Sequence, residues 1–263
     1  MDGRVFSRQD GAVRTLVISN PARRNAMSGA MWQSLADQIA EADAADSVRV
    51  IVVQGDGDLA FVAGADISTF ASQRTDPEDQ RRFNAALDAA YAAPGRAKKA
   101  VIAKIRGVCF GGGLGLAAAC DMRVAAADAR FRMPAARLGL GYAVPGVARF
   151  MHLIGVANTL DIFLTARIFD ALEAQRMGFV PEVVPVEQLD LRVQQLASAI
   201  AQNAPLTIAA LKLAVGALSG AQVGEIAARA DVCEALARCA GSEDYMEGTR
   251  AFMEKRAPQF RGC

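Results

Sequence analysis

Two runs of apolar residues constrain the fold of this chain more than any other feature of its sequence. Residues 48–54 read VRVIVVQ and residues 100–105 read AVIAKI. Runs that are apolar at nearly every position are typical of strands buried on both faces, as in a parallel sheet covered by helices. A segment with helical periodicity at 29–45 precedes the first run, and a segment with helix-ending signals at 76–93 lies between the two runs. This alternation of strand and helix predicts an α/β fold for the first two thirds of the chain.

The last third of the chain is expected to be almost wholly helical. Helical segments are predicted at 186–201, 205–218, 223–240 and 242–255. With 263 residues, the chain is long enough for one large domain with an appendage. We therefore predict a core over 1–200 and a helical region over 201–263.

Charge and residue usage argue against several classes of protein. The 29 Lys and Arg residues balance 28 Asp and Glu residues, which is unlike a nucleic-acid-binding protein. A single histidine, His152, and five cysteines without a CxxC pair argue against a Ser-His-Asp triad, a metal site and a disulfide framework. The N-terminus lacks the apolar segment of a signal peptide, and Asp121 and Arg123 interrupt the apolar run at 107–127. We predict a cytoplasmic protein with no membrane span, metal or nucleic-acid partner.

A glycine run, GGGLGLA at 111–117, follows a predicted strand and begins a helix. Unpaired N–H groups at a helix start face any bound ligand, and glycine lets that ligand approach the backbone closely. Residues 113–118 imitate the GxGxxA pattern of dinucleotide sites, but no acidic residue ends the next strand as an NAD site requires. Close helix packing is a second interpretation. A third is an oxyanion hole whose other N–H donor comes from FVAGADI at 61–67, a second glycine turn that enters a helix.

Motifs along nearly the whole chain resemble the crotonase superfamily, also called the enoyl-CoA hydratase/isomerase family. They are NAM at 25–27, FVAGADI at 61–67, IRGVCFGGGLGLAAACD at 105–121, FRMP at 131–134, LG at 138–139 and the tail at 243–260. The resemblance implies a crotonase-like spiral of ββα turns with a helical C-terminal trimerisation region. It further implies an acyl-CoA substrate, with coenzyme A as its carrier and no metal or NAD cofactor. A homotrimer or a dimer of trimers is the implied assembly.

The resemblance also assigns roles to particular residues. The N–H groups of Ala65 and Gly112 would hold the thioester oxygen as negative charge builds on it. The residues expected to line the coenzyme A side are Arg23, Arg24, Ala26, Ala63, Asp66 and Ile67. Phe252 and Lys255 match tail residues that reach the coenzyme A of a neighbouring subunit in the family. The alternative interpretation of the arginines is solvated surface charge.

Two positions depart from the hydratase pattern. The hydratases place glutamates where this chain has Gly115 and Ala135. Hydration requires a base for the water and an acid for the α-carbon, and neither Gly nor Ala transfers a proton. Ordinary hydratase activity is therefore doubtful, unless a carboxylate such as Asp161 or Glu173 enters the site from elsewhere.

Tyr142 offers a different chemistry. It follows Leu138-Gly139 at the distance at which the methylmalonyl-CoA decarboxylase branch carries a tyrosine, and SEDYMEG at 242–248 also resembles that branch. The match is incomplete, because Ala65 replaces the histidine of that branch and Gly115 replaces its glutamate. Loss of CO₂ forms an enolate without a base, so Tyr142 is a candidate catalytic residue; a packing role is the alternative.

Three functions remain open at this point. The chain is a decarboxylase or other CoA-thioester lyase that uses Tyr142, a weak hydratase or isomerase that uses another acid, or an acyl-CoA-binding protein without catalysis. Arg137 has two interpretations as well, as a salt bridge at the pocket rim or as a group that recognises an acyl carboxylate.

Overall fold

The computed structural model describes residues 3–66, 77–218 and 230–263. Its larger sheet has the strand order β1-β2-β3-β5-β7-β10. These strands are β1 (Arg4–Asp10), β2 (Val13–Ser19), β3 (Val50–Gly55), β5 (Ala100–Ile105), β7 (Met122–Ala126) and β10 (Glu182–Val184). The β1–β2 pair is antiparallel and the other pairs are parallel. The α/β fold expected from the apolar runs is confirmed.

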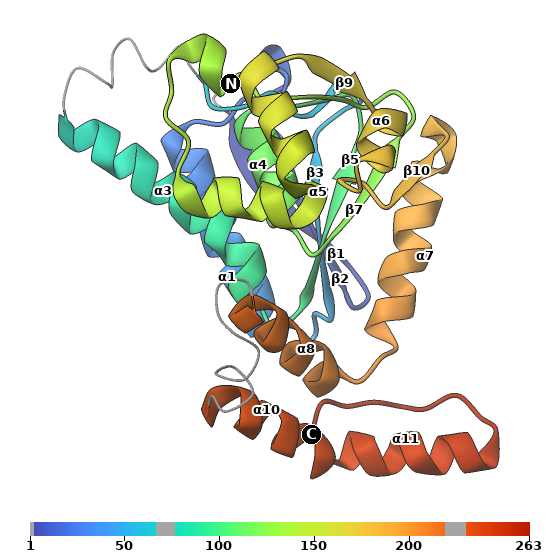
Figure 1. Cartoon of the computed structure of the whole chain (residues 1–263). Coiled ribbons are helices and arrows are strands. Elements are labelled where there is room, and N and C mark those ends of the chain that lie inside the picture. The colour runs from blue at the N-terminus through green and yellow to red at the C-terminus, as the bar shows by residue number, and fades with distance from the viewer. Residues whose placement is uncertain (1–2, 67–76, 219–229) are drawn as a thin grey trace.

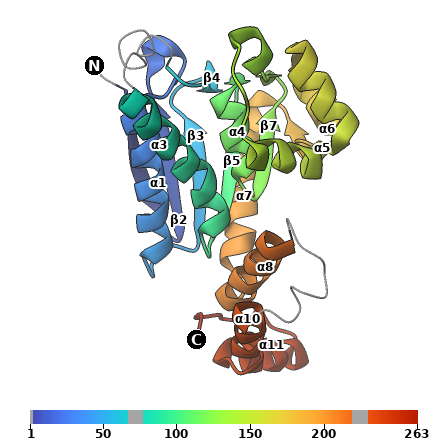
Figure 2. The ribbon, with the colours of Figure 1, turned by 60° about the vertical axis from the view of Figure 1, so that its left-hand side comes forward.

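Helices cover both faces of the larger sheet (Figure 2). On one face lie α1 (Gly29–Ala44), α3 (Pro77–Arg96) and α4 (Gly112–Ala119), and on the other lies α7 (Leu189–Ala201). The residues of β3 and β5 alternate between these two apolar clusters, as Val50 and Val52 do on the α7 side. Burial on both faces explains why these strands are apolar at almost every position.

A smaller sheet supports the glycine turns. Its order is β4-β6-β8-β9, and its strands are β4 (Ala60–Val62), β6 (Val108–Phe110), β8 (Arg130–Arg132) and β9 (Ile168–Asp170). The β4–β6 and β6–β8 pairs are parallel, so the chain leaves these strands at the same edge. Three-residue strands are too short to show an alternating pattern, and the sequence did not predict them.

One predicted helix end was wrong. We expected this helix to span 76–93, but α3 continues to Arg96 with Pro94 inside it. The turn is held from outside, because Lys212 Nζ donates to the carbonyl oxygens of Pro94 and Lys99, each at 2.8 Å. Tertiary contacts thus outweigh the local cost of proline here.

The helix α5 (Val144–Thr165) is long and apolar enough to pass a length-and-hydropathy test for a membrane span. Gly155, with a φ of 74° and a ψ of 168°, breaks it into two shorter helices, close to the two segments predicted at 145–154 and 158–165. A span needs about 20 continuous helical residues. The segment Val186–Ala201 and the helix α8 (Pro205–Leu218) pass the same test only as a pair bent by 103°.

The helical C-terminal region is also confirmed. The helices α8 (Pro205–Leu218), α10 (Ala230–Ala240) and α11 (Glu243–Glu254) lie at one end of the molecule, beyond the sheets (Figure 1). The remaining elements are the helix α6 (Ala171–Arg176) and the 3₁₀ turns η1 (Pro21–Arg23), η3 (Ala135–Leu138) and η4 (Val186–Gln188). The domain boundary at residue 200 stays a prediction.

Candidate active site

Two backbone turns at the ends of adjacent parallel strands form the centre of the site. One turn follows β4 and carries Ala65, and the other follows β6 and carries Gly112 as the first residue of α4. Each is preceded by a glycine with positive φ: Gly64 at 119° and Gly111 at 50°. Few other residues adopt such a conformation, which explains the glycine at both places.

The two turns lie in contact. A Cβ atom added to Gly64 would lie 3.7 Å from the Gly112 nitrogen, and one added to Gly112 would lie 3.5 Å from the Ala65 nitrogen. A parallel bridge to Met27 uses the Gly64 oxygen and the Asp66 nitrogen and leaves the Ala65 N–H outside the ladder. Neither the Ala65 nor the Gly112 N–H donates to another backbone group among the described residues. Two adjacent amides that remain available are the geometry an oxyanion hole needs.

Ala65 and Gly112 both line a cavity of about 1540 Å³. Its wall comes from the two turns, from one side of α3, from η3 and the segment after it, and from the start of α5. Phe83, Leu87 and Tyr91 line it from α3 at helical spacing. The wall is mostly apolar around a few converging polar groups, as is typical of a small-molecule site.

Two tyrosine hydroxyls occupy the space into which a side chain at position 115 would extend. A Cβ atom added to Gly115 would lie 2.5 Å from the Tyr91 hydroxyl and 2.7 Å from the Tyr142 hydroxyl. Both tyrosines line the cavity, and the Tyr91 hydroxyl donates to the Gly112 carbonyl at 3.1 Å. Gly115 therefore has no space for a larger side chain while the two tyrosines stand where they do.

The two phenols are protonated at neutral pH. Burial raises the pKa of Tyr142 to about 12 and holds the pKa of Tyr91 well above its usual value of 10.0. The Tyr142 hydroxyl oxygen is buried and makes no hydrogen bond of good geometry with the described residues. It lies near the Tyr91 hydroxyl, and each tyrosine contributes to the pKa shift of the other. A buried hydroxyl without a good partner is costly, and the neighbouring Tyr91 hydroxyl is the group that lies nearest to offset that cost.

At the second departure from the hydratase pattern, Ala135 lines the same cavity and is almost fully buried. Among the described residues of the cavity wall, the carboxylates are Asp66 and Asp88. Asp66 is paired with Arg23, whose Nη1 donates to its two oxygens at 2.7 and 2.6 Å.

The residues expected around coenzyme A are only partly brought together. The cavity wall includes Arg23, Ala26, Ala63 and Asp66. Arg24 is absent from it, and Ile67 lies outside the described residues. Phe252, which is 86% exposed on α11, and Lys255, which caps that helix, also lie outside the cavity wall of this chain.

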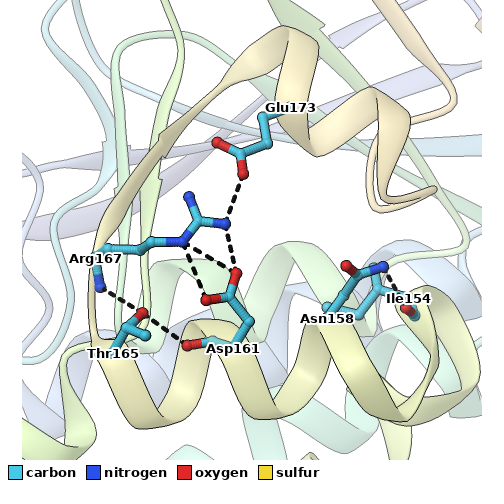
Figure 3. A network of polar contacts seen from close by, with 6 residues as sticks. All are labelled: Ile154, Asn158, Asp161, Thr165, Arg167 and Glu173. Atoms are coloured by element: carbon cyan, nitrogen blue, oxygen red, sulfur yellow. Dashed lines mark hydrogen bonds and ion pairs between the residues drawn. The ribbon is translucent and has the colours of Figure 1, made fainter.

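The alternative acids Asp161 and Glu173 bind elsewhere. Both pair with Arg167, whose Nη2 lies 2.5 Å from Asp161 Oδ2 and 2.6 Å from Glu173 Oε1 (Figure 3). This network joins the end of α5 to α6, and none of its three charged groups lines the cavity. Arg137 is exposed and is also absent from the wall. The structure therefore offers neither Asp161 nor Glu173 as the missing acid.

Sequence reasoning missed Tyr91, Asp88 and Arg149, all of which line the cavity. A signal for Tyr91 was present, because Phe83, Leu87 and Tyr91 recur every four residues along one helix face. No comparable signal marks Arg149, whose place depends on how α5 packs against α3.

Comparisons with known proteins agree with this geometry. The family model described as enoyl-CoA hydratase/isomerase matches residues 8–263. A short-chain-enoyl-CoA hydratase of Clostridium acetobutylicum is 31% identical, over 96% of this chain and 95% of that protein. A carnitinyl-CoA dehydratase of Proteus mirabilis is 33% identical, over 96% of each.

Solved structures give the same result. The crystal structure of an enoyl-CoA hydratase/carnithine racemase from Magnetospirillum magneticum has a TM-score of 0.92 and 32% identity, covering 100% of this chain and 97% of that one. The fold is thus the crotonase fold that the motifs indicated. The chain belongs to the enoyl-CoA hydratase/isomerase family and is an enzyme of that family acting on acyl-CoA.

Proposed function

We propose that this enzyme holds an acyl-CoA thioester oxygen between the N–H groups of Ala65 and Gly112 and stabilises the enolate. Loss of a substrate carboxylate as CO₂ is the reaction that this site supports best. The observation that carries the proposal is the pair of protonated tyrosine hydroxyls at Gly115, where the hydratases of the family have a glutamate.

The steps balance without a protein base. The bond between the α-carbon and the carboxylate breaks, CO₂ leaves, and the electron pair becomes the enolate. Its oxygen charge meets the two amides, which need no reorganisation to receive it. Tyr142 then gives its proton to the α-carbon and regains one from water. With a pKa of about 12, Tyr142 holds its proton at neutral pH, and the enolate carbon is basic enough to take that proton.

The first test is mass spectrometry of methylmalonyl-CoA and, separately, crotonyl-CoA with the purified enzyme in heavy-oxygen water. We expect propionyl-CoA and CO₂ from the first substrate and little labelled 3-hydroxybutyryl-CoA from the second. Rapid labelled product from crotonyl-CoA would overturn the proposal in favour of hydration. Tight binding of thioesters with no product from either would point to a binding protein.

Tyr142→Phe separates catalysis from binding. We expect turnover to fall about 10²-fold, the lower range for a lost proton donor, with affinity for coenzyme A unchanged. Tyr245→Phe is the matched control, because Tyr245 is the third tyrosine of the chain and is exposed on α11. Unchanged turnover in Tyr142→Phe would assign Tyr142 to packing.

A second candidate reaction, isomerisation of an enoyl-CoA double bond, is favoured by one observation. Asp88 is exposed on α3 and lines the cavity three residues before Tyr91, and one carboxylate suffices to move a proton between two carbons. Asp88→Asn should abolish turnover of a 3-enoyl-CoA if this reaction occurs. Decarboxylation should survive the same substitution.

We extend the proposal to the assembly. Large apolar side chains of α10 and α11 are exposed in the single chain: Leu236, Met246, Phe252 and Met253. They support a homotrimer or a dimer of trimers, in which Phe252 and Lys255 of one copy reach the coenzyme A of another.

We propose a cytoplasmic enzyme that needs neither metal nor NAD; loss of turnover on treatment with a chelator would contradict this.

A further inference from the structure

Arg149 lies in the cavity wall, and no carboxylate of the described residues pairs with it. It is partly buried on α5 and makes no ion pair among the described residues. Its one side-chain hydrogen bond there runs from Nη2 to the Tyr91 carbonyl oxygen, and at 3.4 Å it is long. A guanidinium has five N–H donors, so most of its donors remain available to a ligand.

The packing of α5 places Arg149 beside the tyrosines. Gly146 carries no side chain, and the Tyr142 ring fills the space that its Cβ would occupy. Arg149 follows Gly146 by three residues on the same helix, so the two lie on one face. Its positive charge lowers the pKa of both Tyr91 and Tyr142, against the larger effect of burial.

We propose that Arg149 binds a carboxylate carried by the acyl group, so that the substrate is a CoA monothioester of a dicarboxylic acid. The inference rests on the proposed function for the placement of the thioester at Ala65 and Gly112. Arg149, and not Arg137, is then the residue that selects such a substrate, because Arg137 lies outside the cavity wall.

The role of Arg149 is binding and not rate enhancement. A guanidinium attracts the negative carboxylate of the substrate more strongly than neutral CO₂, so it stabilises the ground state of a decarboxylation. An interaction that is lost on the way to the transition state lowers KM but does not raise kcat. Arg149→Met should therefore raise KM for methylmalonyl-CoA without lowering kcat.

Equilibrium binding tests the subsite independently of turnover. Calorimetric titration compares succinyl-CoA with butyryl-CoA, and glutaryl-CoA with pentanoyl-CoA, pairs in which a methyl group replaces the carboxylate. We expect the wild type to prefer a dicarboxylic thioester by about ten- to a hundredfold, the range for a hydrogen bond to a charged group. Arg149→Met should remove this preference, and Arg149→Lys should keep part of it.

Each result has one meaning. Arg137→Met is the control and should keep the preference, and free coenzyme A should bind all variants equally if they fold. No preference in the wild type overturns the subsite, as does a preference that survives Arg149→Met. If Arg149→Met weakens binding of both thioesters of a pair equally, Arg149 serves only to hold the Tyr91 carbonyl, and the proposed subsite is overturned. If the preference is found but no CO₂ is released from methylmalonyl-CoA, the subsite stands and the decarboxylation fails.

Discussion

Two pairs of polar groups meet in the cavity, and the sequence controls them in different ways. The amides of Ala65 and Gly112 belong to the backbone, so their position depends on the positive-φ turns at Gly64 and Gly111. The hydroxyls of Tyr91 and Tyr142 belong to side chains and converge on Gly115 from different elements. A single substitution removes a hydroxyl, whereas most substitutions leave an amide in place. The family fold can thus keep its amide pair while the acid–base groups beside it are exchanged.

The largest effect is expected from deleting one amide. Gly112 is the first residue of α4, a position where proline fits the helix and lacks only the N–H. Gly112→Pro should lower turnover of methylmalonyl-CoA about 10²–10³-fold relative to Gly112→Ala. Alanine is the matched control, because either side chain meets the Trp32 ring at 2.9 Å. Equal kcat values in the two variants would show that the Gly112 amide does not hold the developing charge.

Introducing a glutamate at position 115 should not produce a hydratase. In Gly115→Glu the new Cβ meets both tyrosine hydroxyls below 3 Å, and overpacking of this kind costs about 1–3 kcal/mol. We expect a lower midpoint of urea unfolding and no hydration of crotonyl-CoA. Adding Tyr142→Phe removes one of the two hydroxyls, so the double variant should recover part of the lost stability. A Gly115→Glu enzyme with wild-type stability and rapid hydration would refute the idea that the two tyrosines take the place of a glutamate at position 115.

Alkaline pH should distinguish the two pairs, because only the hydroxyls titrate. The pKa of Tyr142 is about 12 in the folded enzyme against 10.0 for an ordinary tyrosine. The folded state thus keeps a proton that the unfolded state loses. This stabilisation is full below pH 10 and is lost as the pH rises from 10 toward 12.

The loss should amount to about 1.4 kcal/mol per pH unit for this group. Urea unfolding of the wild type and of Tyr142→Phe at pH 9, 10 and 11 measures it as a difference in slope. Parallel slopes for the two proteins would mean that Tyr142 is not buried as a neutral phenol.

The same division explains how much the sequence could predict. The runs at 48–54 and 100–105 predicted β3 and β5, because burial on both faces leaves a continuous apolar pattern. The family resemblance of the motifs around Gly64 and Gly111 pointed to the amides of Ala65 and Gly112, and the structure brings these two turns together, since a glycine turn is a local feature of the chain. Tyr91 and Arg149 could not be placed in this way, because their meeting with Tyr142 depends on how α3 and α5 pack.

The smallest effect is expected at the coenzyme A side, where two neighbouring arginines take different places. Arg23 lines the cavity and shares its charge with Asp66, whereas Arg24 does not line the cavity. Because Asp66 already offsets part of its charge and its side chain is 48% exposed, Arg23 should attract a phosphate only weakly. Arg23→Gln should weaken binding of free coenzyme A about three- to fivefold at low salt, and Arg24→Gln by less than about twofold.

Salt sharpens this last comparison. Exposed charges are screened over about 10 Å at 0.1 M ionic strength and over about 3 Å at 1 M. The difference between the two arginine variants, measured by calorimetric titration, should therefore shrink in high salt, whereas the effect of Gly112→Pro on turnover should persist. A larger loss in Arg24→Gln than in Arg23→Gln would mean that the phosphates of coenzyme A lie nearer to Arg24 than to Arg23.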